Sequence, residues 1–296
     1  MKRRSLLQWA TAAAAGPALG QAGPALTRAI PSTGEAIPRV GLGTWITFNV
    51  GNDPPARAAC TQVVRAFLDG GGRVIDSSPM YGSSQGVVGD ALRALGGQQR
   101  VFSADKVWTS SDGAAQVEQS RGLWQVPRFD LLQVHNLLAW ERQLPLLQAM
   151  KERKQLRYVG ITTSEGRRHR EFEQVMRGQP LDFVQLTYSL VEREAEARLL
   201  PLAADRGIAV LANRPFAEGQ LLRRLQRHPL PPWAAEIECT SWAQFALKFV
   251  VSHPAVTCAI PATRRVDHVR ENLGVLRTRL PDEAMRKRMA AHVAAL

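Results

Sequence analysis

Residues 73–108 read RVIDSSPMYGSSQGVVGDALRALGGQQRVFSADKVW and contain one complete strand–helix–strand unit. Two short apolar runs, RVIDSS and VFSADK, flank the segment GVVGDALRAL, whose apolar residues have helical spacing. Strands that alternate with helices along a chain pair in parallel. We therefore predict a parallel sheet built from units of this kind.

The same alternation runs through the chain from about residue 39. Eight strand-like runs occupy residues 39–45, 73–78, 101–106, 130–135, 156–162, 182–188, 207–212 and 256–261. Segments with helical spacing separate nearly all of them, at 59–70, 86–95, 141–153, 169–178, 195–207 and 242–254. Eight repeats favour a closed (β/α)8 TIM barrel, an α/β fold, over an open doubly wound sheet.

An open sheet that binds a dinucleotide needs a GxGxxG loop at the start of a helix. Gly41 and Gly43 are present here, but Ile46 occupies the third glycine position, and no GK[ST] phosphate loop occurs. A nucleotide would therefore have to bind by another route. The proline-rich segment 215–233 is long for a loop of a barrel, so we expect it to carry function.

The composition is that of an ordinary enzyme domain. The 296 residues are 45% hydrophobic and 22% charged, enough for one large domain or two small ones. The net charge of +12 does not indicate nucleic-acid binding, because its densest run, 167–170, lacks aromatic residues and is typical of a solvated helix face. Cys60, Cys239 and Cys258 are widely spaced, so we predict buried thiols and neither disulfides nor a metal site.

The first 25 residues differ from the rest. Lys2, Arg3 and Arg4 precede an alanine-rich apolar stretch and small residues, an order typical of an export leader. The stretch is too short to span a bilayer, so we expect no stable membrane insertion. Paired arginines resemble the bacterial twin-arginine leader, which uses its own export machinery and carries folded proteins. We predict a leader at 1–25, a barrel at 26–296 and a periplasmic location; a basic disordered tail on a cytoplasmic protein is the alternative.

Four polar residues stand at or just after the ends of three successive runs: Asp76, Tyr81, Lys106 and His135. In a (β/α)8 barrel the carboxyl ends of the strands meet at one rim, where the active site lies. Asp76 can pair with the Lys106 ammonium, which we expect to lower the pKa of the Tyr81 phenol. His135 can orient a substrate oxygen by a hydrogen bond. The four predict proton donation to a carbonyl oxygen while another group delivers hydride.

Apolar residues near these four suggest a cavity for a small carbonyl compound. The candidates for its wall are Trp45, Met80, Trp108 and Leu137. Each of them could instead be packing at the top of the barrel.

With these residues in place, the chain resembles an aldo-keto reductase from about residue 37 to residue 292. The resemblance rests on VGLGTW, VIDSSPMYG, SADKVW, LLQVHN, VGITT, VQLTYSL, GIAVLANRPF and AIPATRRVDHVREN. It implies that Asp76, Tyr81, Lys106 and His135 are catalytic, with Tyr81 as the general acid. It also implies a nicotinamide dinucleotide, NADP(H), bound across the barrel top without a Rossmann loop, and a monomer.

The resemblance further implies a set of cofactor-binding residues. They are Thr162, Thr163, Gln185, Phe216, Thr263, Arg264, His268, Glu271 and Asn272, with Tyr188 as an alternative to Phe216 for stacking. An arginine at position 264 suits a 2′-phosphate, which favours NADP over NAD.

Two departures from the family pattern concern the cofactor. Thr162 and Thr163 replace the common Ser-Asn pair, and Asn213 with Arg214 replaces a small polar pair. The leading hypothesis is an NADPH-dependent reductase of an aldehyde or ketone. The competing hypothesis is a nucleotide-binding redox-sensing or auxiliary barrel with little turnover, because one fold can serve both.

Overall fold

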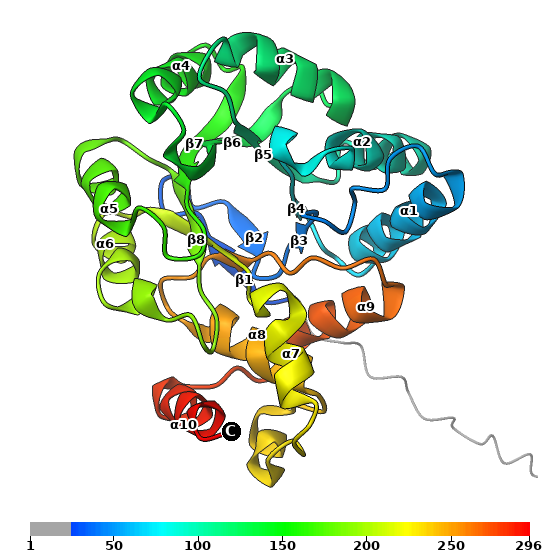
Figure 1. Ribbon diagram of the computed structural model, residues 1–296, viewed down its shortest axis with the longest axis vertical. Helices are drawn as coiled ribbons and strands as arrows, with labels where there is room; N and C mark the ends of the chain where they lie inside the picture. Colours follow the sequence, from blue (N-terminus) through cyan, green and yellow to red (C-terminus); the bar gives the residue numbers. More distant parts are fainter. Residues whose placement is uncertain (1–24) are drawn as a thin grey trace, which may run out of the picture.

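Eight parallel strands surround a central axis in the computed structural model, which describes residues 25–296 (Figure 1). The strands are β3 (Leu42–Gly43), β4 (Val74–Asp76), β5 (Phe102–Val107), β6 (Phe129–Val134), β7 (Leu156–Thr162), β8 (Phe183–Thr187), β9 (Ala209–Asn213) and β10 (Cys258–Ala259). Each pairs with its neighbour in chain order. All eight lie within or overlap the runs predicted from the sequence, so the (β/α)8 prediction is confirmed.

The sheet closes between its first and last strands. Val40 forms a parallel bridge with Ala259, and Gly43 forms another with Ala262. The Gly41 N–H donates to the Ala259 carbonyl at 2.8 Å. A Cβ on Gly43 would stand 2.7 Å from the carbonyl oxygen of Ile260, so glycine permits this close approach of the two edges. Closure leaves the sheet without an exposed edge.

Helices cover the outside of the barrel, as Figure 1 shows. They are α1 (Pro54–Asp69), α2 (Ser84–Leu95), α3 (Gly113–Trp124), α4 (Trp140–Glu152), α5 (His169–Gly178), α6 (Leu199–Asp205), α7 (Gln220–Leu225), α8 (Trp242–Ser252), α9 (Val266–Gly274) and α10 (Glu283–Ala294). The sequence patterns had not indicated α3, α7, α9 or α10. No helix within residues 25–296 combines the length and the apolarity needed to cross a bilayer.

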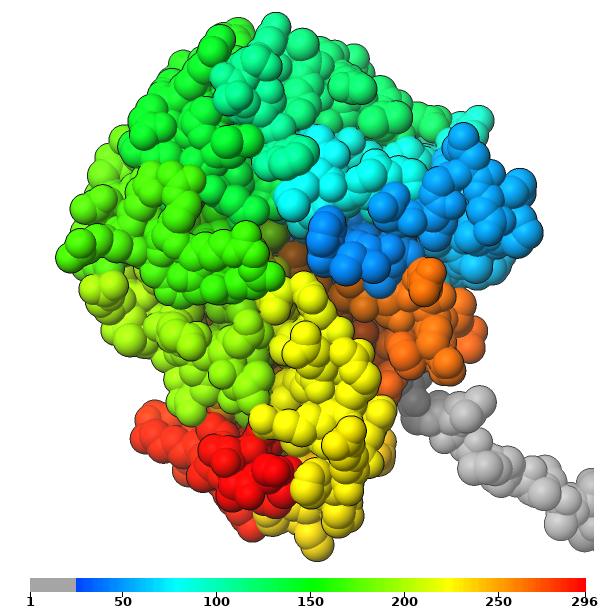
Figure 2. Space-filling model, in the orientation of Figure 1, coloured from blue at the N-terminus to red at the C-terminus, as the bar shows by residue number. Residues whose placement is uncertain are grey.

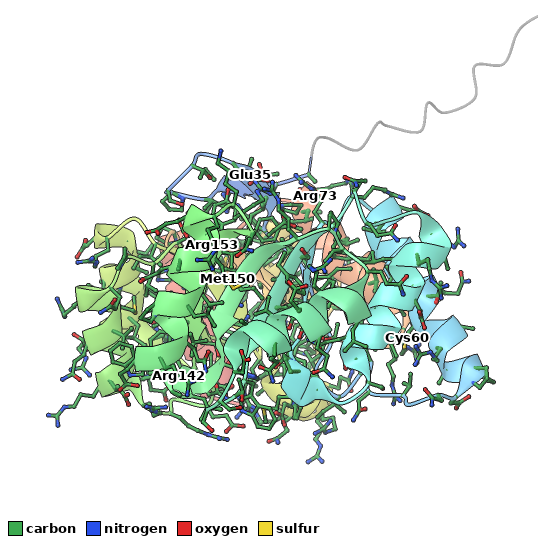
Figure 3. The ribbon with its side chains drawn as sticks, turned by 90° about the horizontal axis from the view of Figure 1, so that it is seen from above. Glu35, Cys60, Arg73, Arg142, Met150 and Arg153 are labelled. Carbon is green, nitrogen blue, oxygen red and sulfur yellow. The ribbon has the colours of Figure 1, made fainter. Side chains whose placement is uncertain are left out.

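The far end of the barrel is sealed by a hairpin that the sequence patterns had not indicated. Strands β1 (Thr27–Ala29) and β2 (Ala36–Pro38) pair antiparallel. Ile30 and Ile37 of this hairpin join the apolar side chains that fill the barrel interior, including Phe102 and Phe183. Glu35 lies at this end and Arg142 at the opposite end in Figure 3. The hairpin leaves the carboxyl ends of the strands as the accessible face.

That accessible face is hollowed at its centre, between the loops after the strands and the yellow insertion (Figure 2). The insertion 215–233 contains α7 and the start of a 3-10 helix, Pro232–Ile237. Its residues Phe216, Gly219 and Leu222 line the hollow. The three cysteines are buried free thiols, as predicted.

Candidate active site

The centre of the site is a buried ion pair between neighbouring strands. Asp76 ends β4 and Lys106 is the penultimate residue of β5. The Lys106 ammonium donates to Asp76 Oδ2 at 2.7 Å and to the Ser77 carbonyl at 2.7 Å. Both side chains are almost completely buried. Burial by itself lowers the pKa of Lys106, but the charge of Asp76 and the Tyr81 phenol outweigh it, so the pKa is raised.

Tyr81 lies directly beside this ion pair. It ends a short 3-10 helix, Pro79–Tyr81, whose start is capped by the Ser78 hydroxyl. The Lys106 ammonium is 5.0 Å from the centre of the phenol ring. The ring also packs against Trp45 at 4.9 Å between centroids, and against the edge of His135 at 5.7 Å. The four side chains therefore lie together at one rim of the barrel, as predicted from the sequence.

The predicted direction of the Tyr81 pKa shift is wrong. Burial raises the pKa of the phenol to about 12, and the positive charge of Lys106 offsets only part of that rise. The carboxylates of Asp76 and Asp105 raise it further. The phenol consequently keeps its proton throughout the neutral range, as a proton donor must.

His135 follows β6 and is held by a residue that the sequence patterns had not indicated. The Ser78 hydroxyl lies 2.8 Å from His135 Nδ1. Burial, followed by the charge of Lys106, holds the pKa of His135 well below its ordinary value. The ring is therefore neutral and carries one N–H. When the Ser78 hydroxyl donates to Nδ1, that proton is on Nε2 and can be donated to a substrate oxygen.

A cavity of about 730 Å³ opens over these groups and continues toward the N-terminal ends of α8 and α9. Asp76, Tyr81 and His135 line it, whereas Lys106 lies behind them. Of the predicted cofactor residues, its walls contain Thr162, Gln185, Phe216, Thr263, His268, Glu271 and Asn272. In the part of the chain that the structure describes, no group of three or more His, Cys, Asp or Glu side chains could hold a metal ion.

Two predicted cofactor residues and the alternative stacking residue stand outside this cavity. The Thr163 hydroxyl donates to the Arg167 carbonyl at 2.5 Å, and Arg264 is exposed on the surface. Tyr188 is fully buried and bonds to Glu196 and Arg286, which packs α10 onto the barrel. Of the two predicted candidates for stacking, Phe216 is therefore the one that lines the cavity.

Of the four predicted substrate residues, two line the cavity and two do not. Trp45 and Met80 line the cavity and are 38% and 37% exposed, so their apolar surface is available to a ligand. Leu137 is fully buried in the core outside the barrel, and Trp108 is exposed beyond the cavity wall. Hydrogen bonds from both ends of the Gln116 amide hold the main chain of Trp108 in that position.

Gln185 connects the cofactor part of the cavity to the ion pair. Its Nε2 donates to Asp76 Oδ1 at 2.8 Å. Among the described residues its amide oxygen has no hydrogen-bond partner, so it can accept an N–H from a bound amide. Asp76 thus binds Lys106 with one oxygen and orients Gln185 with the other.

Comparison with known proteins agrees with this geometry. The model of the "Aldo/keto reductase family" matches residues 39–292. The chain is 29% identical over 250 residues to "Methylglyoxal reductase YeaE" of Escherichia coli K12, covering 81% of this chain and 86% of that protein. It is 26% identical over 260 residues to "9,11-endoperoxide prostaglandin H2 reductase" of Trypanosoma cruzi, covering 84% and 86%.

Solved structures of aldo/keto reductases also resemble this chain. An aldo/keto reductase from Klebsiella pneumoniae in complex with NADP and acetate superimposes with a TM-score of 0.73 at 27% identity, covering 87% of this chain and 93% of that one. A glycerol dehydrogenase from Gluconobacter oxydans, at 23% identity over 91% and 95% of the two chains, has the same fold with a TM-score of 0.73. From its sequence, its closed barrel and the four side chains at its rim, the chain belongs to the aldo/keto reductase family.

Proposed function

We propose that this protein is an NADPH-dependent reductase of a small aldehyde or ketone. The observation that carries the proposal is the Lys106 ammonium 5.0 Å from the centre of the Tyr81 ring, which lies in the wall of a cavity that His135 also lines. A protonated phenol and a neutral imidazole together can hold and protonate one carbonyl oxygen. Lys106 balances the negative charge that develops on the phenol when its proton leaves.

The cavity fits a nicotinamide dinucleotide. When bound, the nicotinamide supplies the hydride. Gln185 has an amide oxygen free to accept a carboxamide N–H, and Phe216 offers an aromatic surface. The polar residues Thr263, His268 and Asn272 line the far end, beside the start of α9, where main-chain N–H groups favour phosphate. The Klebsiella relative in complex with NADP supports NADP(H) as the cofactor.

The apolar residues near Tyr81 indicate how the substrate is held. Trp45 and Met80 flank the phenol and can pack against the carbon skeleton of a carbonyl compound. His135 then fixes the oxygen, which directs the carbonyl toward Tyr81. The monomeric state stays a prediction.

The competing role is an auxiliary or redox-sensing barrel that binds nucleotide and turns over little. The intact set of four side chains, with the ion pair and the His135 contacts formed, favours the enzyme.

Reductase activity is tested by NADPH consumption over a panel of aldehydes and ketones. We expect turnover with several of them, and we expect Gln185→Leu to weaken NADPH binding by about tenfold, measured by fluorescence titration. Gln174→Leu, on the exposed face of α5, is the matched control and should leave the dissociation constant unchanged. Tight NADPH binding with no turnover on any carbonyl would favour the auxiliary role.

We propose, in addition, that residues 1–25 direct export by the twin-arginine machinery. The support is Lys2, Arg3 and Arg4 ahead of an apolar stretch; residues 1–24 lie outside the described part of the structure. Export of a folded chain would let it carry its nucleotide with it. Cell fractionation with N-terminal analysis should find shortened protein in the periplasm, and Arg3→Lys with Arg4→Lys should retain it in the cytosol. Full-length wild-type protein found in the cytosol alone contradicts export and favours the cytoplasmic alternative.

A further inference from the structure

Asp105 is a buried carboxylate that the mechanism above does not use. It has no exposed surface, and it precedes Lys106 on β5. Ala104 belongs to the barrel interior, so alternation along the strand directs Asp105 outward, toward the helices. There Gln85 of α2 donates to Asp105 Oδ2 at 2.7 Å and to Ser120 of α3 at 2.9 Å.

The other oxygen of Asp105 supports the main chain of the catalytic lysine. The pairing of β4 with β5 ends at Asp76 and Ala104. Beyond that pair the Ser77 carbonyl accepts from the side chain of Lys106, and the Lys106 N–H donates to Asp105 Oδ1 at 2.7 Å. The carboxylate therefore takes the place of a strand partner where the ladder stops.

The charge of Asp105 is poorly compensated. The titratable groups around it are Lys106 on its own strand, Asp76 on β4 and the protonated phenol of Tyr81, and Lys106 is already paired with Asp76. From the helices, the uncharged amide of Gln85 bonds to it, and that amide also bonds to Ser120. Burial accordingly raises the pKa of Asp105 to about 7, although Lys106 and Gln85 act to lower it.

We propose that Asp105 is a positioning residue of this site: its carboxylate fixes the backbone of Lys106, whose ammonium stands 5.0 Å from the centre of the Tyr81 ring, and its charge contributes to how strong a proton donor Tyr81 is. This inference rests on the proposed reductase function. Burial is the main cause of the raised pKa of Tyr81, and ionised Asp105 adds to that rise and makes the phenol a weaker acid. Protonated Asp105 removes that effect. Carbonyl reduction should therefore slow as the pH rises through about 7.

The first measurement is kcat against pH in the wild type and three variants. We expect the wild-type kcat to fall by about three- to tenfold across the inflection, while Asp105→Asn, which keeps an acceptor oxygen, loses the inflection. Asp105→Ala also removes the acceptor for Lys106 N–H and should lower kcat about tenfold with KM and NADPH affinity unchanged. Gln85→Leu should move the inflection to higher pH, because the Gln85 hydrogen bond lowers the pKa of Asp105.

A matched control is Asp130 of β6, which contacts the other end of β5. The carboxylate of Asp130 accepts the Ser103 N–H of β5 at 2.7 Å, so Asp130→Asn alters an equally close contact far from Tyr81. This control should keep the wild-type inflection. If Asp105→Asn keeps the inflection in kcat against pH, the charge of Asp105 does not act on Tyr81. If Asp105→Ala has the kcat of the wild type, the carboxylate does not position Lys106.

A second measurement does not depend on turnover. The pKa of Asp105 is higher in the folded protein than the ordinary value of about 3.9 in the unfolded chain, so the native state binds the extra proton between these values. Wild-type stability should therefore fall relative to Asp105→Asn as the pH rises from about 4 to about 7. Equal pH dependence of thermal unfolding in the two proteins overturns the inference. A wild type that reduces no carbonyl refutes the proposed function, while the unfolding comparison still decides the charge of Asp105.

Discussion

Tyr81→Phe should bind NADPH with unchanged affinity and lose carbonyl reduction by about a thousandfold, within the roughly 10²–10⁴-fold range for a positioned proton donor. The substitution removes only the hydroxyl. The ring can keep its contacts with Trp45 and His135. The loss should appear in kcat, because the phenol acts on charge that develops in the transition state.

Single-turnover kinetics with saturating NADPH separates this loss from cofactor binding. Tyr158→Phe is the matched control: that hydroxyl bonds to Glu35 and Thr33 at the hairpin end of the barrel, far from the cavity. It should leave kcat within about threefold of wild type. A Tyr81→Phe variant that binds NADPH normally and retains the wild-type rate would refute the assignment of Tyr81 as proton donor.

Lys106→Met should cost both activity and stability. Among the described residues, removing Lys106 leaves the carboxylate of Asp76 with the Gln185 amide as its one side-chain partner. Breaking a buried ion pair in this way should lower the free energy of unfolding by about 3–5 kcal/mol. It also removes the positive charge that acts to lower the pKa of Tyr81. We expect kcat to fall at least about a hundredfold, measured together with unfolding in urea.

The double variant Asp76→Asn/Lys106→Met distinguishes the two effects. An asparagine at position 76 can keep an oxygen acceptor for Gln185 without a buried charge, so most of the lost stability should return. Activity should stay low, because the ammonium beside Tyr81 is still missing. Recovery of kcat together with stability would mean that Lys106 acts only in folding.

Much of the site could be predicted from the sequence because parallel strands end at a common edge. The runs that end near Asp76, Lys106 and His135 are each recognisable from local pattern, and their order in the chain is their order around the barrel. Ser78 was missed although it lies within the quoted stretch 73–108. A serine two residues after a strand has many local uses, and nothing local indicates that it meets His135, 57 residues away.

By itself, the sequence determined the eight-stranded barrel and the rim at which Asp76, Tyr81, Lys106 and His135 lie. These follow from periodicity and chain order, which are local properties. Only the tertiary structure decided the direction of the Tyr81 pKa shift, the burial of Asp105 and the exclusion of Trp108 and Leu137 from the cavity. Each of these depends on how segments distant in the chain exclude water and place charges beside one another.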